Sequence, residues 1–306
     1  MSDRLQEISI FARVAESRSF SRAARELGLS QPSVSRIVSE LEARLGVKLV
    51  LRTTRRVVPT DAGARFLQDV RPVLRALEEA ENAARAADSL SGSLRIAMSV
   101  AFGVREVIPI LPPFLAAHPR LEVEFMISDD QHDLIAEGVD VAIRLGRLPD
   151  SGFGARLLAT SPRLVVGSPA YLTARRVPKT LSDLSAHDCV FGPGGSARTG
   201  WTFIRDGAPM PITVGGRIQT ASAEGLIACV KAGLGLAIAS VWMCRDELAS
   251  GALVPVLADY ALEPIEAHAV FPSGPHPSSK VRAFVDHLIG MLDKRTPQAG
   301  PLPGDT

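Results

Sequence analysis

The sequence predicts a multi-domain protein of the α + α/β class, and three observations lead to this prediction. Two short amphipathic helical patterns separated by glycine lie between Ser19 and Gly46, a single long helical pattern follows Thr60, and short β-rich runs alternate with helical runs from Leu94 onward. The chain has 306 residues, of which 46% are hydrophobic, enough for two or three units that each have a core.

The segment from Ser19 to Gly46 has the pattern of two helices joined by a tight turn. Apolar residues spaced three and four apart form one buried face of the first helix: Phe20, Ala23, Ala24 and Leu27. Gly28 can take the left-handed conformation that ends a helix, and Ser30 can cap the next helix. That second helix buries Val34, Ile37, Val38, Leu41 and Leu45. A further helix between Leu5 and Ala15 completes the core, so a helix-turn-helix is predicted.

The outward face of the second helix is polar, mainly in its first two turns. Its candidate DNA-contacting residues are Ser30, Gln31, Ser33, Ser35, Arg36 and Ser39. Serine and arginine can bond base edges and phosphates, and in this motif the N-terminal residues of the second helix reach the bases. The alternative is a helical hairpin with no role in DNA binding, whose outward charges are only solvated.

The next segment, Leu49 to Val58, alternates apolar and polar residues and is predicted to be a β-hairpin, the wing. Three arginines near its tip would lie against phosphates beside the groove: Arg52, Arg55 and Arg56. Between Met1 and Arg65 there are 12 Lys and Arg against 7 Asp and Glu, whereas the rest of the chain has 22 against 26. This asymmetry fits a basic nucleic-acid module joined to a mildly acidic domain.

A long helix capped by Thr60 is expected after the wing. Four apolar residues follow the alternating three and four spacing of a coiled-coil seam, namely Leu67, Val70, Leu74 and Leu77, and Pro72 should bend the helix slightly. A second copy of the chain would complete such a seam and set two recognition helices on two half-sites of DNA. The alternative is that the seam packs against the chain's own C-terminal domain.

The pattern changes to α/β after a linker predicted at Ser89 to Ser93. Expected strands are Leu94–Val100, Leu121–Ile127, Val139–Leu145, Arg163–Val166, Asp188–Phe191, Ile212–Val214 and Ile265–Phe271. Expected helices are Gly103–His118, Ala223–Ala232, Val241–Leu248 and Ser279–Leu292. The last ten or so residues are rich in Pro and Gly and are expected to fray.

The run from Val14 to Gly63 resembles the DNA-binding domain of LysR-type transcriptional regulators. It contains AESRSFSRAARELGLSQPSVSRIVSELEARLG followed by KLVLRTTRRVVPTDAG, and departs from the family at Val50, where an aromatic residue is usual. The second half is similar to the family's effector-binding region, through LRIAMSVAFG, DLIAEGVDVAIRLGRLPDS, SPAYL, DLSAHDCV, ACVKAGLGLAI and GALVPVL.

The resemblance implies a periplasmic-binding-protein-like fold for the second half, with two α/β lobes joined by two crossover strands. The implied division is a winged helix-turn-helix at 1–60, a linker and dimerisation helix at 61–91, an effector-binding domain at 92–294 and a flexible tail at 295–306. Within the effector-binding domain, lobe I would comprise 92–160 and 268–294, and lobe II 161–267.

Two strand-to-helix junctions are candidate ligand positions, because free N–H groups at helix N-termini attract anions. One is Ser99, Val100, Ala101 and Phe102, and the other is Ala221 and Ser222. We therefore expect a small organic acid as effector, with the serines as donors and Phe102 and Trp201 as apolar walls. The alternative for both serines is simple helix capping.

Two further positions are candidates for effector binding. Arg144 could pair with a ligand carboxylate or instead neutralise Asp129 or Asp140, and Ser196 could approach the cleft from the GPGGS loop. At Ala221 and Ser222 the sequence departs from the family, whose related pattern has more amide or acidic side chains.

Other classes of protein fit the sequence less well. There is no G-x-S-x-G elbow, the histidines are scattered, and Gly192, Gly194 and Ala197 do not open a helix, so neither an enzyme, a metal site nor a cofactor is expected. A cysteine-based redox-sensing regulator is the alternative within regulation, and Cys189, Cys229 and Cys244 are expected to be reduced thiols. A solute-binding protein is disfavoured by the polar N-terminus and the DNA motif.

We therefore expect a cytoplasmic DNA-binding transcriptional regulator whose promoter binding is modulated by an effector. Its partners would be double-stranded promoter DNA, the effector and further copies of itself, as a dimer through the linker helix and as a homotetramer by family analogy. RNA polymerase is a further candidate partner. No apolar run approaches the roughly 20 residues that a membrane helix needs, so no membrane contact is expected.

Overall fold

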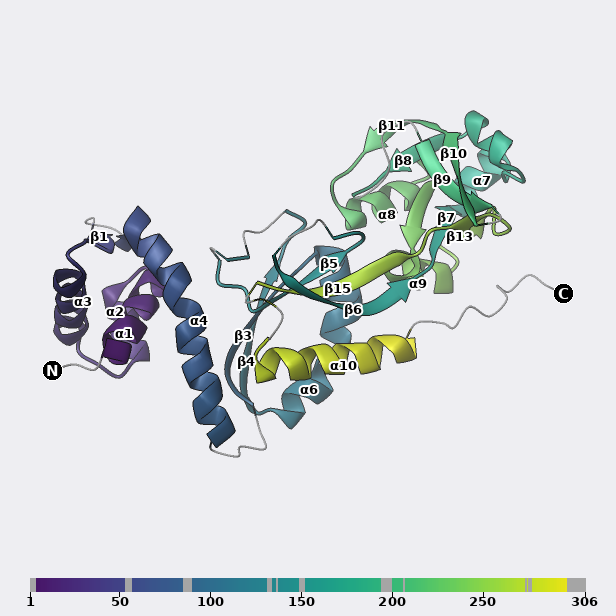
Figure 1. Cartoon of the computed structure of the whole chain (residues 1–306). Coiled ribbons are helices and arrows are strands. Elements are labelled where there is room, and N and C mark those ends of the chain that lie inside the picture. The colour runs from purple at the N-terminus through teal and green to yellow at the C-terminus, as the bar shows by residue number, and fades with distance from the viewer. Residues whose placement is uncertain are drawn as a thin grey trace. The chain divides into compact units, whose positions relative to one another are not determined.

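The computed structural model describes residues 4–52, 57–84, 90–130, 134–135, 137–148, 152–193, 200–205, 207–272, 274 and 277–295. The chain forms two compact units, which are described separately. The first consists of residues 1–90 with 133–138, and the second of 91–132 with 139–306 (Figure 1). The first unit is mainly helical and the second mixes helices and sheets, so the predicted α + α/β class is confirmed.

Three helices form the core of the first unit: α1 (Arg4–Ser17), α2 (Phe20–Glu26) and α3 (Gln31–Leu45). Phe11, Val34 and Leu41 are fully buried among them. The predicted signals at the helix ends are present, because the Ser30 hydroxyl accepts from the Ser33 N–H and Gly46 ends α3 in the left-handed conformation with φ 71°. The helix-turn-helix prediction is thus confirmed.

The wing and the linker helix follow directly. Strands β1 (Val50–Arg52) and β2 (Val57–Pro59) pair antiparallel, and α4 (Asp61–Ala84) starts where the Thr60 hydroxyl accepts from the Gly63 N–H at 2.9 Å. The predicted long helix is therefore present, and it continues through Pro72.

Part of the apolar seam expected on α4 does not have the role that was predicted for it. Leu67 belongs to the same buried core as α1 to α3, and Leu74 packs against that core. These residues therefore pack on the chain's own helix-turn-helix core. Neither the predicted dimer seam nor the alternative of packing on the C-terminal domain anticipated this contact. Val73 and Leu77 remain exposed, at 52% and 37%.

The second unit contains two lobes. We call lobe I the part built on a five-stranded sheet in the order β4-β3-β5-β15-β6. Its strands are β3 (Ser91–Met98), β4 (Arg120–Ile127), β5 (Val141–Leu145), β6 (Gly154–Ser161) and β15 (Ile265–Phe271). Strand β3 pairs parallel with β4 and β5, while β15 pairs antiparallel with β5 and β6. The C-terminal helix α10 (Ser279–Arg295) packs beside α6 (Pro112–Ala117), with the rings of Phe284 and Phe114 5.7 Å apart (Figure 1).

Two expectations for lobe I were wrong. Ser91 to Ser93 begin β3 rather than belonging to a linker, because they pair with β4. The single helix expected from Gly103 is three short segments: a π-helical turn η1 (Gly103–Val107), a 3₁₀ turn η2 (Ile108–Ile110) and α6. A further short helix, α5 (Val100–Phe102), precedes them. Proline at 109, 112 and 113 removes backbone donors along this stretch, which explains the breaks.

Lobe II consists of small sheets covered by short helices. Its strands are β7 (Arg163–Gly167), β8 (Asp188–Phe191), β9 (Gly200–Arg205), β10 (Ala208–Thr213), β11 (Gly215–Gln219), β12 (Ala237–Ser240), β13 (Val254–Val256) and β14 (Ala261–Leu262). Its helices are α7 (Pro169–Arg175), the 3₁₀ segment η3 (Leu181–Ala186), α8 (Ala223–Lys231) and α9 (Val241–Ala249).

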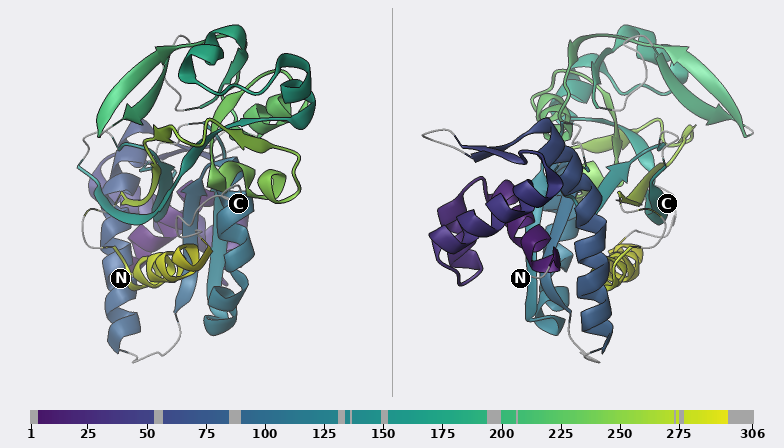
Figure 2. Two further views of the ribbon diagram at one scale, coloured as in Figure 1. Left: turned by 90° about the vertical axis from the view of Figure 1, so that its right-hand side faces the viewer. Right: turned by 60° about the vertical axis from the view of Figure 1, so that its left-hand side comes forward.

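The chain passes between the lobes twice, from β6 into β7 and from β14 into β15. Figure 2 shows the same lobes from two further sides, with the antiparallel β9–β10 hairpin extending from lobe II. Ile212, at which the strand predicted over 212–214 begins, lies instead near the end of β10 in this hairpin, opposite Trp201.

Candidate functional site: a nucleic-acid interface and a junction between two lobes

The structure places the predicted polar face of α3 on the surface. Ser30, Gln31, Arg36 and Ser39 are exposed, while Ser33 and Ser35 are half-buried. They lie outward because Val34, Ile37, Val38 and Leu41 hold the opposite face in the core. The exposed end is also the N-terminal end of the helix, where free N–H groups favour a phosphate.

Most of these side chains bond to near neighbours. The Ser30 and Ser33 hydroxyls lie 2.8 Å apart, the Ser21 hydroxyl donates to Gln31 Oε1 at 3.2 Å, and Ser39 donates to the backbone oxygen of Ser35. Arg36 pairs with Glu40 one turn later, and both side chains are exposed, at 65% and 43%. Because exposed pairs of this kind contribute about 0–1 kcal/mol, the guanidinium can exchange Glu40 for a base or phosphate at little cost.

The wing is described only in part. Arg52 is the last residue of β1 and lies opposite Val57, whereas Arg55 and Arg56 lie outside the described residues. Val50, the position that departs from the family pattern, is 6% exposed and belongs to the core of the unit. A valine therefore fills this position without opening the core.

In lobe I, two of the predicted ligand residues offer polar groups at the start of α5, and the other two are buried. Ser99 makes no side-chain capping bond, and Val100 N–H donates to Asp129 Oδ1 at 3.0 Å. Ala101 and Phe102 are 4% and 2% exposed, and the Phe102 ring packs edge-on against Trp242 at 5.1 Å. A carboxylate of the protein itself thus already occupies the first N–H of this helix end.

The predicted ligand residues of lobe II have mainly structural contacts. The Ser222 hydroxyl accepts from the Gly225 N–H at 3.4 Å, as the capping alternative expects, and Ala221 is exposed. Trp201 is 4% exposed and belongs to a core cluster with Phe203. Ser196 lies outside the described residues.

Arg144 lies near the end of β5, half-buried, opposite His268 of β15. Both carboxylates suggested as its partners accept from backbone N–H groups. Asp140 accepts from the Arg95 N–H at 2.8 Å, and Asp129 accepts from the Val100 N–H.

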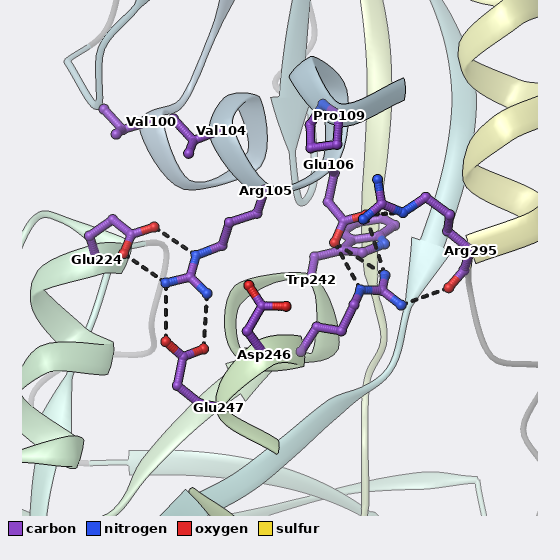
Figure 3. Close-up of a pocket in the computed structure, with 11 residues that line it drawn as sticks. Val100, Val104, Arg105, Glu106, Pro109, Glu224, Trp242, Asp246, Glu247 and Arg295 are labelled. Atoms are coloured by element: carbon purple, nitrogen blue, oxygen red, sulfur yellow. Dashed lines mark hydrogen bonds and ion pairs between the residues drawn. The ribbon is translucent and has the colours of Figure 1, made fainter. Parts of the chain in front are cut away.

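A set of charged residues that the sequence did not reveal lies where the lobes meet. A cavity of about 570 Å³ is lined there by the η1 segment, α8 and α9 (Figure 3). Arg105 of lobe I binds two carboxylates of lobe II, with Nε 2.8 Å from Glu224 Oε1 and Nη1 2.9 Å from Glu247 Oε2. The second oxygen of Glu224 bonds Arg105 Nη2 at 2.9 Å, so this contact is bidentate (Figure 3).

A second ion pair crosses the junction in the opposite sense. Arg245 of lobe II binds Glu106 of lobe I through Nη2 at 3.1 Å, and the Glu106 side chain is 1% exposed. Burial raises the pKa of Glu106, while Arg245 and Arg295 act against that rise. Arg105 and Glu106 are adjacent residues of η1. Through their ion pairs, η1 contacts both α8 and α9 of lobe II.

The Arg105 contacts also change the carboxylates. The hydrogen bond from Arg105 holds the pKa of Glu224 below its ordinary value. Burial acts to raise the pKa of Glu247, but the hydrogen bond from Arg105, a backbone hydrogen bond and the charges of Arg105 and Lys231 together outweigh it, so the pKa is lowered. Both groups are therefore anions near neutral pH, as a stable link between lobes requires. No local pattern in the sequence indicates this link, since Arg105 lies 119 and 142 positions from its partners.

The cysteines and possible metal ligands complete the description. Burial raises the pKa of Cys189 and of Cys244 to about 12, which leaves little reactive thiolate at neutral pH. Cys229 is half-buried. Within the described ranges no group of three or more His, Cys, Asp or Glu is arranged to hold a metal ion. No helix in the described part of the chain is long and apolar enough to cross a membrane.

Comparison with known proteins matches two family models to this chain. Residues 5–64 match the bacterial regulatory helix-turn-helix protein of the lysR family, and residues 87–293 match the LysR substrate binding domain. An uncharacterized HTH-type transcriptional regulator of Haemophilus influenzae is 33% identical over 91% of this chain and 97% of its own length.

The HTH-type transcriptional regulator CrgA of Neisseria meningitidis serogroup C is similar over a greater share of the chain. It is 32% identical over 95% of this chain and 98% of its own length. The solved structure of CrgA, a LysR-type transcriptional regulator from Neisseria meningitidis, covers 96% of this chain and 99% of its own, with a TM-score of 0.56 and 28% identity. These matches extend over both units, and on them the chain belongs to the family of LysR-type transcriptional regulators.

Proposed function

We propose that this regulator binds promoter DNA through the N-terminal face of α3 and the wing, and that a small molecule bound in the second unit changes that binding. The observation that carries the first part is the exposed polar surface at the start of α3. Gln31 and Arg36 project there from a helix whose other face is fixed in the core. Arginine and glutamine can read guanine and adenine in the major groove, and the arginines of the wing would hold phosphates.

The effector is proposed to be a small organic acid bound near the start of α5 and α8. The Ser99 hydroxyl makes no capping bond, and Ser222 makes a long one of 3.4 Å, so both can donate to a ligand. The proposed site also includes the other positions predicted from the sequence: Val100, Ala101, Phe102, Arg144, Ser196, Trp201 and Ala221. Phe102 and Trp201 support it from the core rather than through a large exposed surface.

The bond between Val100 and Asp129 sharpens this proposal. An acid that accepts a hydrogen bond from the Val100 N–H must displace the Asp129 carboxylate. Otherwise the acid binds beside Asp129, through the Ser99 hydroxyl. A ligand carboxylate beside the Asp129 carboxylate would be repelled by it. If Asp129 keeps its bond to Val100, the anionic group of the ligand should therefore be held mainly by Ser99, Ser222 and Arg144. Titration with carboxylates and with their amides tests the idea, because only the carboxylates should raise the melting temperature of the chain.

Coupling between effector and DNA is proposed to pass through the lobe junction. Glu224 is two residues from Ser222, and it binds Arg105 across the junction. A ligand that draws the start of α8 toward lobe I would favour the arrangement in which this pair is made, and by linkage would shift the DNA-binding equilibrium.

The proposed role involves binding and not catalysis, and the protein would act in the cytoplasm, where promoter DNA lies. A dimer joined along α4 and a tetramer of such dimers are proposed assemblies, and RNA polymerase is a proposed partner at the promoter. The redox alternative rests on Cys229, since the pKa of Cys189 and of Cys244 is raised. Retention of the effector response by a variant with all three cysteines changed to serine would exclude it.

A footprint on the DNA upstream of the protein's own gene tests the proposed function as a whole. We expect protection of two half-sites about one helical turn or a small multiple apart, with a pattern that changes when the effector is added. Protection that is uniform along the fragment, or that no member of a carboxylate panel changes, would contradict the DNA part or the effector part respectively.

A further inference from the structure

The base of the wing is bound to the recognition helix by one buried side chain. Glu42 of α3 has a side chain that is 6% exposed. Its Oε1 accepts from the backbone N–H groups of Leu49 and Val50 at 2.9 and 3.1 Å, and its Oε2 accepts from Lys48 Nζ at 2.6 Å. One carboxylate thus bonds three consecutive residues, which we call the wing root, at the point where β1 begins.

The wing root is held from its other side by the start of α4. The Thr60 N–H donates to Leu49 O at 2.9 Å, and the Thr60 hydroxyl donates to Lys48 O at 2.7 Å. Gly63 lies so close that a Cβ atom there would be 1.9 Å from Leu49 O. The wing root is therefore fixed between the recognition helix and the linker helix.

Glu42 is well placed to decide the direction of the wing. The hairpin has only three residues in each strand, and a two-stranded hairpin of that size has little stability of its own. Burial acts to raise the pKa of Glu42, but the bonds from Lys48 and the two N–H groups outweigh it, so the pKa is lowered and the group is an anion at neutral pH. Hydrogen bonds to an ionised acceptor are about twice as strong as neutral ones.

We infer that Glu42 is a positioning residue for DNA binding, which holds the wing at the angle to α3 that lets both reach the same stretch of duplex. The carboxylate does not contact DNA. Without it, the Leu49 and Val50 N–H groups lose the acceptor that ties them to α3, and the hairpin can turn about its remaining bonds to Thr60. The arginines at the wing tip would then miss the phosphates while α3 still reaches the bases.

The experiment measures the slope of log affinity against log salt for the full-length protein and a promoter duplex. Two changes are made at Glu42: E42Q, which keeps an acceptor oxygen, and E42M, which keeps the size but no acceptor. Glu7 of α1 supplies a matched control, because its buried carboxylate also bonds a residue of α3, Arg44, at 2.8 Å. E7M should lower the melting temperature without changing the slope.

We expect E42M to flatten the slope by about 0.9 for each phosphate that the wing no longer neutralises, and E42Q to keep most of the wild-type slope. A triple variant, R52A with R55A and R56A, should flatten the slope by itself, and adding E42M to it should flatten it no further. A wild-type slope in E42M, or a further flattening when E42M is added to the triple variant, overturns the inference.

This inference rests on the proposed wing contacts, and the triple variant separates the two ideas. If the triple variant keeps the wild-type slope, the wing contacts and the role of Glu42 both fall. If the triple variant flattens the slope and E42M does not, the wing contacts stand and only the Glu42 inference is wrong.

Hydrogen exchange of the wild-type protein provides a second measurement that needs no stable variant. The Leu49 and Val50 amides should exchange as slowly as the core of α3. Exchange at the rate of an exposed loop would show that Glu42 does not hold the wing root, and would overturn the inference.

Discussion

Arg36 is the residue whose contribution to DNA recognition can be isolated most cleanly. It is exposed, and it forms a surface ion pair with Glu40. We expect Arg36→Ala to weaken binding to the specific promoter site by about 1–3 kcal/mol, roughly 5- to 150-fold, because alanine cannot reach the base while the fold is unchanged. Binding to a shuffled duplex should change little. Equal weakening on both duplexes, measured by fluorescence anisotropy, would show that Arg36 contacts only the backbone.

Arg55 provides the opposite case within the same unit. We expect Arg55→Ala to weaken binding to the specific and the shuffled duplex alike, and to reduce the salt slope by about 0.9, since a phosphate contact carries no sequence information. The same anisotropy series measures it. An effect confined to the specific duplex would assign Arg55 to base recognition instead.

Gly63 is a residue where the shape of the backbone decides stability. A Cβ atom would lie 1.9 Å from the Leu49 carbonyl oxygen, so Gly63→Ala must push the wing root away from α4. We expect the free energy of unfolding to fall by about 1–3 kcal/mol, as for other overpacked sites, measured by urea unfolding. Gly46→Ala is the comparison, because its Cβ would meet nothing within 4 Å and only its φ of 71° is unfavourable. A Gly63 variant more stable than the Gly46 variant would contradict the close packing.

At the level of single residues, the sequence predicted which side chains point outward but not which ones join distant segments. The face of α3 followed from helical periodicity, because four of the five apolar residues predicted to be buried there are buried and fix the orientation of the rest. The fifth, Leu45, was predicted wrongly, since it lies at the end of the helix and is 38% exposed. Glu42 and Arg105 look like ordinary surface charges in the sequence. Their partners become neighbours only when the chain folds, and no local pattern records that contact.

Among the elements, α4 combines two functions along its length. Leu67 and Leu74 pack on the DNA-binding core, whereas Val73 and Leu77 are exposed. We expect the double change of Val73 and Leu77 to Asp to dissociate dimers, because it places charges in an apolar contact with a second copy. Analytical ultracentrifugation measures the dissociation, and Gln68→Asp, an exposed position on another face of the helix, is the control. Unchanged association of the double variant would place the dimer contact elsewhere.

The elements with strong periodicity or clear end signals were predicted, and the others were not. Helices α1 to α4, α8, α9 and α10 have long apolar faces or capping residues that are visible in the sequence. Strands such as β9, β11 and β12 were missed because they are short and lie in small sheets, where pairing with distant segments decides the structure. The broken helix after Val100 shows that its prolines outweighed the apolar pattern.

At the scale of the whole effector-binding unit, the Arg105 link predicts how stability depends on pH. Glu224 and Glu247 both have pKa values below the ordinary 4.5, so their contribution is complete above that pH and disappears as the pH falls through their folded-state values. Glu224 is 39% exposed, so most of the effect should come from the buried Glu247. We expect Arg105→Met to lower the melting temperature at pH 7 and the difference from wild type to shrink below pH 4.5.

An exposed pair provides the control for this series. Arg147 and Glu263 are 3.0 Å apart, but their side chains are 89% and 55% exposed. Arg147→Met should leave the melting temperature unchanged at every pH, because solvent screens the pair. A pH-independent difference for Arg105→Met would mean that the variant acts through packing and not through the ion pairs.

The central claim is that an exposed helix face at the N-terminal end of this chain reads a specific duplex. The most direct measurement is the affinity of the purified full-length protein for the DNA upstream of its own gene, against a shuffled duplex of equal length, over a series of salt concentrations. We predict tighter binding to the upstream duplex at every salt concentration, with an affinity for both that falls steeply as salt rises. Equal affinity for the two duplexes, or binding that salt does not weaken, would contradict the account.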